Sequence, residues 1–345
     1  MGAWGRSSGG NSALASPGSD RVVDQERDHN PANEDAVVIT SKLPPSGIVR
    51  LNSSAGGVRC RQIGPADLDA VAELLTTGFP RRDRTYWVAA LRHLRERNVP
   101  EGFPRYGYML VNRDRAVGVL LLIFSLGVNG SAESVRCNVS SWYVTPEFRT
   151  LAPLLVLPAL RHKQVTFINT SPAENTLPTI EAQGFQRFCN GVFAATPALT
   201  ARPRGGKVIR LADTSHPVDY LPASEVELLR DHEARGCLSL IVQMHGDSYP
   251  VVFRRRLVGH RFRFAWLPCA QLIYTRDMEC IVRFSGLIGR YLALRGMPLV
   301  LIGANQAIAK LPGSYYNDKP AMYYRGPDRP RLGDLAYTEA ALFGA

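Results

Sequence analysis

The chain has 345 residues, is 45% hydrophobic and carries a formal net charge of +11 at pH 7. This length allows two domains of ordinary size, and the composition is typical of a soluble globular protein. The longest apolar run, residues 116–124, is too short for a membrane-spanning helix, and the first residues lack the basic-then-apolar order of a signal peptide. The six cysteines show no CxxC pair and no metal-binding spacing, so we expect reduced thiols, no metal, no membrane span and a cytoplasmic location.

The positive charge comes mostly from arginine and allows several kinds of anionic partner. The basic-aromatic run at 260–264, which follows three arginines at 254–256, could track a nucleic-acid backbone and stack on bases. An edge strand with charged outer positions explains the same pattern, and we favour it. We therefore expect no nucleic-acid partner, although the charge leaves that alternative open.

The first 195 residues divide into a polar segment and a domain. Residues 1–56 are rich in Gly, Ser, Pro and charge without apolar periodicity, which predicts disorder. Residues 57–195 form the first predicted domain. Apolar spacing predicts helices at 65–78 and 84–97, and β-branched and aromatic runs predict a hairpin over 106–125 and a strand over 135–145.

The run from Ser140 to Leu155 joins this last strand to a helix predicted over 151–163. Thr145-Pro146 ends the strand, and the corner that follows directs backbone N–H groups and a positive dipole end at one point. Arg149 adds a cation beside it. The corner therefore predicts a phosphate-bearing cofactor. An ordinary strand-to-helix turn with a solvated arginine is the alternative interpretation.

The same run resembles the GNAT (N-acetyltransferase) superfamily of acyl-CoA-dependent acyltransferases. Val144, Pro146 and Arg149 match the family pattern Val-x-Pro-x-x-Arg/Gln-x-x-Gly-x-Gly/Ala, whereas Ala152 and Leu154 replace its glycines and limit how closely the backbone can approach a pyrophosphate. A strand at 164–170, a helix at 174–183 and a closing Gly-Phe at 184–185 follow in the family's order. The resemblance covers residues 57–195 and implies a mixed, mostly antiparallel sheet flanked by helices.

The resemblance also implies acyl-CoA, either acetyl-CoA or a longer acyl-CoA, as co-substrate. Its pantetheine arm would lie between the strands at 138–145 and 165–170, with the Val144 N–H on the thioester carbonyl. Asn175 lies near the start of the helix predicted at 174–183, and the alternative interpretation is that it is simply exposed to solvent in the first turn of that helix. The cofactor-binding residues implied are Val144, Arg149, Thr150, Leu151, Ala152, Pro153, Leu154 and Asn175.

Catalytic residues are less clearly indicated. The family often places an acidic tyrosine four residues before the closing Gly-Phe, where this chain has Ile180. The candidates at the strand ends are Tyr143, Ser141, Asn169 and Ser171. Three have a structural alternative: Tyr143 as a packed strand aromatic, Ser141 as a β-bulge residue, and Asn169 as a cap on the next turn.

The order of elements begins again after a Pro- and Gly-rich linker predicted at 196–214. Over 215–345 we expect a helix at 223–235, a hairpin at 238–256, a strand at 269–275, a helix at 278–294 and a strand at 298–303. The Tyr pairs at 315–316 and 323–324 are expected in a final antiparallel pair. The fold class is therefore α+β or α/β, with two GNAT-like domains in tandem, the second degenerate.

The second domain carries Asp277 and Glu279 where an anion would dock, so we expect no cofactor there and expect this domain to close the acceptor side. The predicted function is direct acyl transfer from acyl-CoA to an amine or hydroxyl of a small-molecule acceptor. The arginines at 254–256 and 261–263 favour an anionic acceptor. An aminoacyl-tRNA-dependent transferase, which also resembles two GNAT folds in tandem, and a non-catalytic acyl-CoA-binding protein are the alternatives. Nothing in the sequence indicates an oligomeric state.

Overall fold

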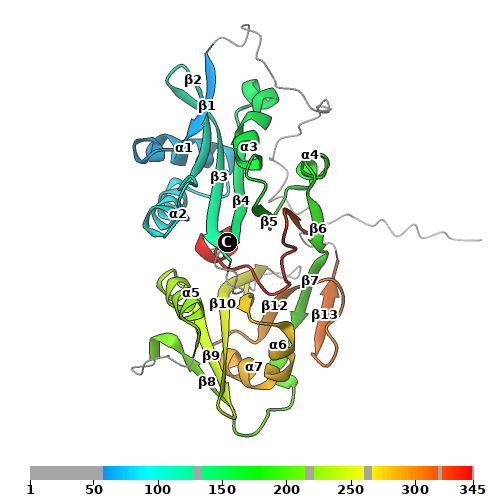
Figure 1. The fold of residues 1–345 in the computed structure, drawn as a ribbon. Coiled ribbons are helices and arrows are strands. Elements are labelled where there is room, and N and C mark those ends of the chain that lie inside the picture. Colours follow the sequence, from blue (N-terminus) through cyan, green and yellow to red (C-terminus); the bar gives the residue numbers. More distant parts are fainter. Residues whose placement is uncertain (1–56, 128–133, 214–220, 260–265, 318–320, 344–345) are drawn as a thin grey trace, which may run out of the picture. The chain divides into compact units, whose positions relative to one another are not determined.

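The structure is a computed structural model that describes residues 57–127, 134–213, 221–259, 266–317 and 321–343. Its strands form two seven-stranded mixed sheets, each accompanied by helices (Figure 1). This confirms the predicted α+β class with two similar folds in tandem. Residues 1–56 and the basic-aromatic run at 260–264 lie outside the described residues.

The first sheet has the strand order β1-β2-β3-β4-β5-β14-β6. In chain order its strands are β1 (Val58–Gln62), β2 (Gly107–Asn112), β3 (Arg115–Leu126), β4 (Val135–Val144), β5 (Val165–Asn169), β6 (Gln186–Cys189) and β14 (Met322–Arg325). Its helices are α1 (Leu68–Gly78), α2 (Arg84–Glu96), α3 (Pro153–Leu160) and α4 (Leu177–Ala182), with 3₁₀ turns η1 (Pro65–Asp67), η2 (Pro146–Leu151) and η3 (Glu174–Thr176).

The centre of this sheet is buried on both faces, and β3 shows why. Val119, Leu121 and Ile123 pack with α1 and α2, while the residues between them pack with α3 and α4 on the opposite face. Successive strand residues point to opposite faces, so a strand covered on both sides is apolar at every position. The helices that cover the sheet thus position the end of β4, where the candidate site lies.

The second sheet has the order β13-β7-β12-β11-β10-β9-β8. Its strands are β7 (Gly191–Ala195), β8 (Lys207–Arg210), β9 (Leu238–Met244), β10 (Asp247–Gly259), β11 (Trp266–Thr275), β12 (Leu299–Ala304) and β13 (Gly313–Tyr316). The remaining helical elements are η4 (Pro197–Leu199), η5 (Leu211–Asp213), α5 (Ala223–Ala234), α6 (Met278–Arg283), α7 (Ser285–Ala293) and α8 (Glu339–Leu342). His245 and Gly246 turn the β9–β10 hairpin with φ of 53° and 90°, as a type I′ turn requires.

Several local expectations differ from the structure. The two sheets exchange strands: β7 pairs with β12 and β13 in the second sheet, and β14 inserts between β5 and β6 in the first. The tyrosine pairs at 315–316 and 323–324 consequently lie in different sheets, and the predicted antiparallel pair was wrong. The linker predicted at 196–214 contains strand β8, which pairs with β9 in the second sheet. Such pairings depend on residues far apart in the chain, which local patterns do not reveal.

Two of the predicted helices also differ from the structure in length or continuity. The helix expected at 151–163 begins at Pro153 and ends at Leu160, after the 3₁₀ turn η2. The helix expected at 278–294 is divided at Phe284 into α6 and α7. In the described parts of the chain, no helix is long and apolar enough to span a membrane, and no cluster of His, Cys, Asp and Glu could hold a metal.

Candidate active site at the split between β4 and β5

The candidate site lies where β4 and β5 separate. The two strands pair in parallel only between residues 135–138 and 165–168, and no described strand pairs with residues 139–144 on that edge of β4. On the other edge, the pairing with β3 shifts between Leu120 and Leu121 and leaves Ser141 as an extra residue with φ 45°. Ser141 is therefore a β-bulge residue, and the bulge bends β4 at the point of separation.

Tyr143, a predicted catalytic residue, is only 8% exposed. Its ring packs beside Phe79, with ring centroids 6.4 Å apart, and against Gly78, where an added Cβ would lie 2.3 Å from the Tyr143 Cγ. Burial raises the pKa of Tyr143, while the Arg149 guanidinium acts in the opposite direction. The ring has the environment of a packed strand aromatic, and its catalytic assignment stays a prediction.

Asn169 and Ser171 lie at the end of β5. The Asn169 Oδ1 accepts a hydrogen bond of 3.3 Å from the Ser171 N–H, which is the local capping interaction offered as its structural alternative. Ser171 is exposed. The geometry thus gives Asn169 a structural role in the turn after β5, and its catalytic role stays a prediction.

The predicted cofactor corner is a tight 3₁₀ turn rather than an open loop. The Ala152 N–H donates to the Arg149 carbonyl at 3.1 Å, the Leu155 N–H donates to the Ala152 carbonyl at 3.1 Å, and Pro153 has no N–H. Ala152 and Pro153 therefore supply no free backbone donor for a phosphate. Ala152 and Leu154 stand where the family pattern has glycines, and their Cβ atoms limit how closely a phosphate can approach the backbone.

Four side-chain atoms on the elements that form or flank this corner are buried without a hydrogen-bond partner in the described part of the protein. They are the Trp142 Nε1 on β4, the Thr145 Oγ1 directly after β4, the Arg149 Nε on η2 and the Asn175 Oδ1 on η3. Leaving a buried polar atom unpaired costs about 1–3 kcal/mol, so such atoms call for a partner. Two N–H donors and an amide suit a ligand that carries both phosphate and amide groups. These residues therefore fit CoA.

A carboxylate that was not predicted from the sequence lies at the split. Glu339, the first residue of α8, accepts hydrogen bonds from the Ser140 and Ser171 hydroxyls, and the Thr170 Oγ1 lies 3.4 Å from its Oε1. The Glu339 N–H donates at 2.8 Å to the Asn138 Oδ1. Glu339 and Ser140 are 199 positions apart, and nothing in the local pattern around residue 339 marks it.

The corresponding split in the second sheet is filled by the chain itself. β11 and β12 pair only between residues 269–271 and 299–301. Beyond that point the Thr275 N–H donates to the Gly333 carbonyl at 2.9 Å, and the Leu335 N–H donates to the Ile273 carbonyl at 2.7 Å. Residues 333–335 thus occupy the edge of β11 that corresponds to the open edge of β4.

The anion-docking position of the second fold is also occupied. Asp277 caps α6, because its Oδ1 accepts a hydrogen bond of 2.7 Å from the Cys280 N–H. A carboxylate that caps a helix satisfies the N–H groups that would otherwise bind an anion. The second corner therefore has a negative charge and a bonded donor where a pyrophosphate would have to bind.

Comparison with known proteins gives a likeness in structure and none in sequence. No family model and no curated protein matches the chain. A GCN5-related N-acetyltransferase from Anabaena variabilis superposes with a TM-score of 0.51 and 12% identity, covering 78% of this chain and 72% of that one. A GCN5-related N-acetyltransferase from Kribbella flavida gives 0.47 and 15%, covering 79% and 72%. Eis1 from Mycobacterium abscessus gives 0.43 and 11%, covering 78% and 73%. The chain has two GNAT-like folds in tandem.

Proposed function

We propose that the protein is an acyltransferase that moves an acyl group directly from acyl-CoA to a small-molecule acceptor. The observation that carries this proposal is the split between β4 and β5, which leaves one edge of β4 open, together with the buried, unpaired polar atoms on β4, η2 and η3. The open edge suits the amide groups of a pantetheine arm, and the Arg149 side chain suits a phosphate. The fold shared with N-acetyltransferases supports the same chemistry.

Within this proposal, the first fold does the chemistry by positioning and polarisation. Val144 supplies the N–H that polarises the thioester carbonyl, and Arg149 and Asn175 hold the nucleotide end, together with the side chains of Thr150, Leu151 and Leu154. The second fold binds no CoA, because its split is filled by residues 333–335 and its corner is capped by Asp277. A cytoplasmic location fits its six free thiols.

Calorimetric titration of the full chain with acetyl-CoA and with longer acyl-CoAs tests the proposal. We expect saturable binding, and we expect Arg149→Ala to weaken it by roughly 1.5–3 kcal/mol through loss of a charged hydrogen bond to phosphate. Arg92→Ala is the matched control, since Arg92 is an exposed arginine on α2. The absence of saturable heat with every acyl-CoA would overturn the proposal. If the protein binds acyl-CoA but transfers the acyl group to no acceptor, the result would favour the alternative of a non-catalytic acyl-CoA-binding protein.

A further inference from the structure

The Glu339 carboxylate is held by hydroxyl groups and has no cationic partner among the described residues. Ser140 and Ser171 donate to its two oxygens from β4 and from the turn after β5. The Ser140 hydroxyl also lies 3.0 Å from that of Ser141, the bulge residue. The Glu339 side chain is half-buried and keeps contact with solvent. A carboxylate can accept about four hydrogen bonds, so these hydroxyls leave acceptor capacity for an incoming group.

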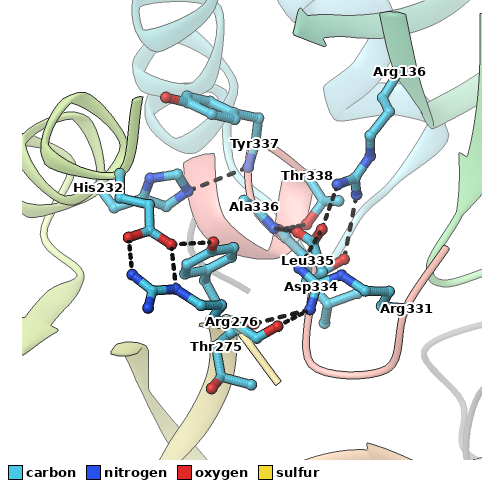
Figure 2. A network of polar contacts seen from close by, with 12 residues as sticks. Arg136, His232, Thr275, Arg276, Arg331, Asp334, Leu335, Ala336, Tyr337 and Thr338 are labelled. Carbon is cyan, nitrogen blue, oxygen red and sulfur yellow. Dashed lines mark hydrogen bonds and ion pairs between the residues drawn. The ribbon is translucent and has the colours of Figure 1, made fainter. Parts of the chain in front are cut away.

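The backbone around Glu339 is fixed on both sides. Before it, Arg136 on β4 forms an ion pair of 2.8 Å with Asp334 and donates to the Asp334 carbonyl at 3.2 Å (Figure 2). The Tyr337 N–H donates to the buried His232 ring at 3.2 Å. After it, the Arg254 Nη1 donates to the Ala341 carbonyl at 2.6 Å. These contacts therefore hold the backbone at Glu339 in a defined position beside β4.

The nearby arginines are already bound to other groups. Arg254 donates to the backbone carbonyls of Arg235 and Ala341, and Arg256 donates to the Gln271 Oε1 at 3.0 Å. Arg254 and Arg256 are two of the arginines at 254–256 and 261–263 from which the sequence favoured an anionic acceptor, and both bind oxygen atoms of the chain itself. An acceptor at the split would meet the Glu339 carboxylate and the hydroxyl groups of Ser140 and Ser171. Such a group attracts a cation and repels an anion.

We infer that the acceptor is a primary amine that enters as an ammonium ion, and that Glu339 binds it and takes its proton. This inference rests on the proposed acyltransferase function. Proton transfer to the Glu339 carboxylate frees the nitrogen lone pair, which forms the new bond to the thioester carbon. The carbon–sulfur bond then breaks, its electrons leave with sulfur, and the second amine proton goes to the thiolate. Glu339 afterwards releases its proton to solvent, so the products are an amide, the free thiol and one proton.

The test compares acceptors that differ in charge. The full chain is incubated with acetyl-CoA and a series of straight-chain α,ω-diamines or the matching diols, and thiol release is followed. We expect release with diamines and none with diols. Glu339→Gln keeps the shape and most hydrogen bonds but neither the charge nor the basicity. It should lower kcat/KM for diamines about 100-fold or more, the size of a general-base effect, and leave the acetyl-CoA Kd unchanged.

Glu279→Gln is the matched control, because Glu279 is an exposed carboxylate on α6, and it should keep full activity. Glu339→Asp keeps the charge on a shorter stem and should fall between the wild type and Glu339→Gln, which keeps the inference testable if Glu339→Gln does not fold. Transfer to diols, no transfer to any diamine, or an unchanged diamine rate in Glu339→Gln would overturn the inference. Loss of acetyl-CoA binding in Glu339→Gln would do the same by indicating a structural role. Failure of the acyltransferase proposal would appear separately, as no acyl-CoA binding by the wild type.

Discussion

Removal of the Asp334 carboxylate tests how strongly residues 333–339 are held. The Asp334 side chain is 3% exposed and that of Arg136 is 14% exposed, with a nitrogen–oxygen distance of 2.8 Å. Deleting one partner of such a pair leaves the other charge buried and unpaired, which costs about 3–5 kcal/mol. Arg136 keeps its bond to the Asp334 carbonyl, so we expect the lower end, about 3 kcal/mol, for Asp334→Ala.

Chemical denaturation of the full chain measures this loss as a change in the free energy of unfolding. The matched control is Asp69→Ala, which breaks the Arg84–Asp69 pair. That pair has nearly the same distance, 2.7 Å, but its side chains are 56% and 91% exposed. Its loss should cost at most about 1 kcal/mol. Equal losses at the two sites would refute the argument, because burial is the difference between them. Replacing both Arg136 and Asp334 with apolar residues should recover much of the stability.

Three further outcomes follow from the structure. Asp277→Ala should leave the acetyl-CoA Kd unchanged but cost about 1 kcal/mol of stability as a lost helix cap; a large change in affinity would place CoA in the second fold. Burial lowers the pKa of His232 to about 4, below its value of about 6.5 when unfolded, so its contribution to stability is present above pH 6.5 and is lost as the pH falls toward 4. His232→Gln should therefore lose less stability than the wild type between pH 7 and 4.5; parallel pH curves would contradict this. Intact-protein mass spectra after acetyl-CoA treatment should show no stable acyl adduct, since burial raises the pKa of the Cys137 thiol, and an adduct there would exclude direct transfer.

The sequence alone predicted the features that depend on neighbouring residues. Strand and helix order, the hairpin at 238–256 and the two tandem folds came from apolar periodicity, turn residues and the spacing around Val144, Pro146 and Arg149. These signals are local, because a helix or strand buries one face through residues a few positions apart. The structural alternative for Ser141 was predicted in the same way, from its place within a strand.

Only the tertiary structure decided which distant segments meet. The exchange of β7 and β14 between the sheets, the filling of the second split by residues 333–335 and the arrival of Glu339 beside Ser140 all join residues more than 50 positions apart in the chain. The backbone pairings among these use N–H and C=O groups that every residue except proline carries, so side-chain patterns do not encode them. The same limit explains the arginines at 254 and 256: the sequence showed their charge, and the fold determined that they bind carbonyl and amide oxygens of the chain itself.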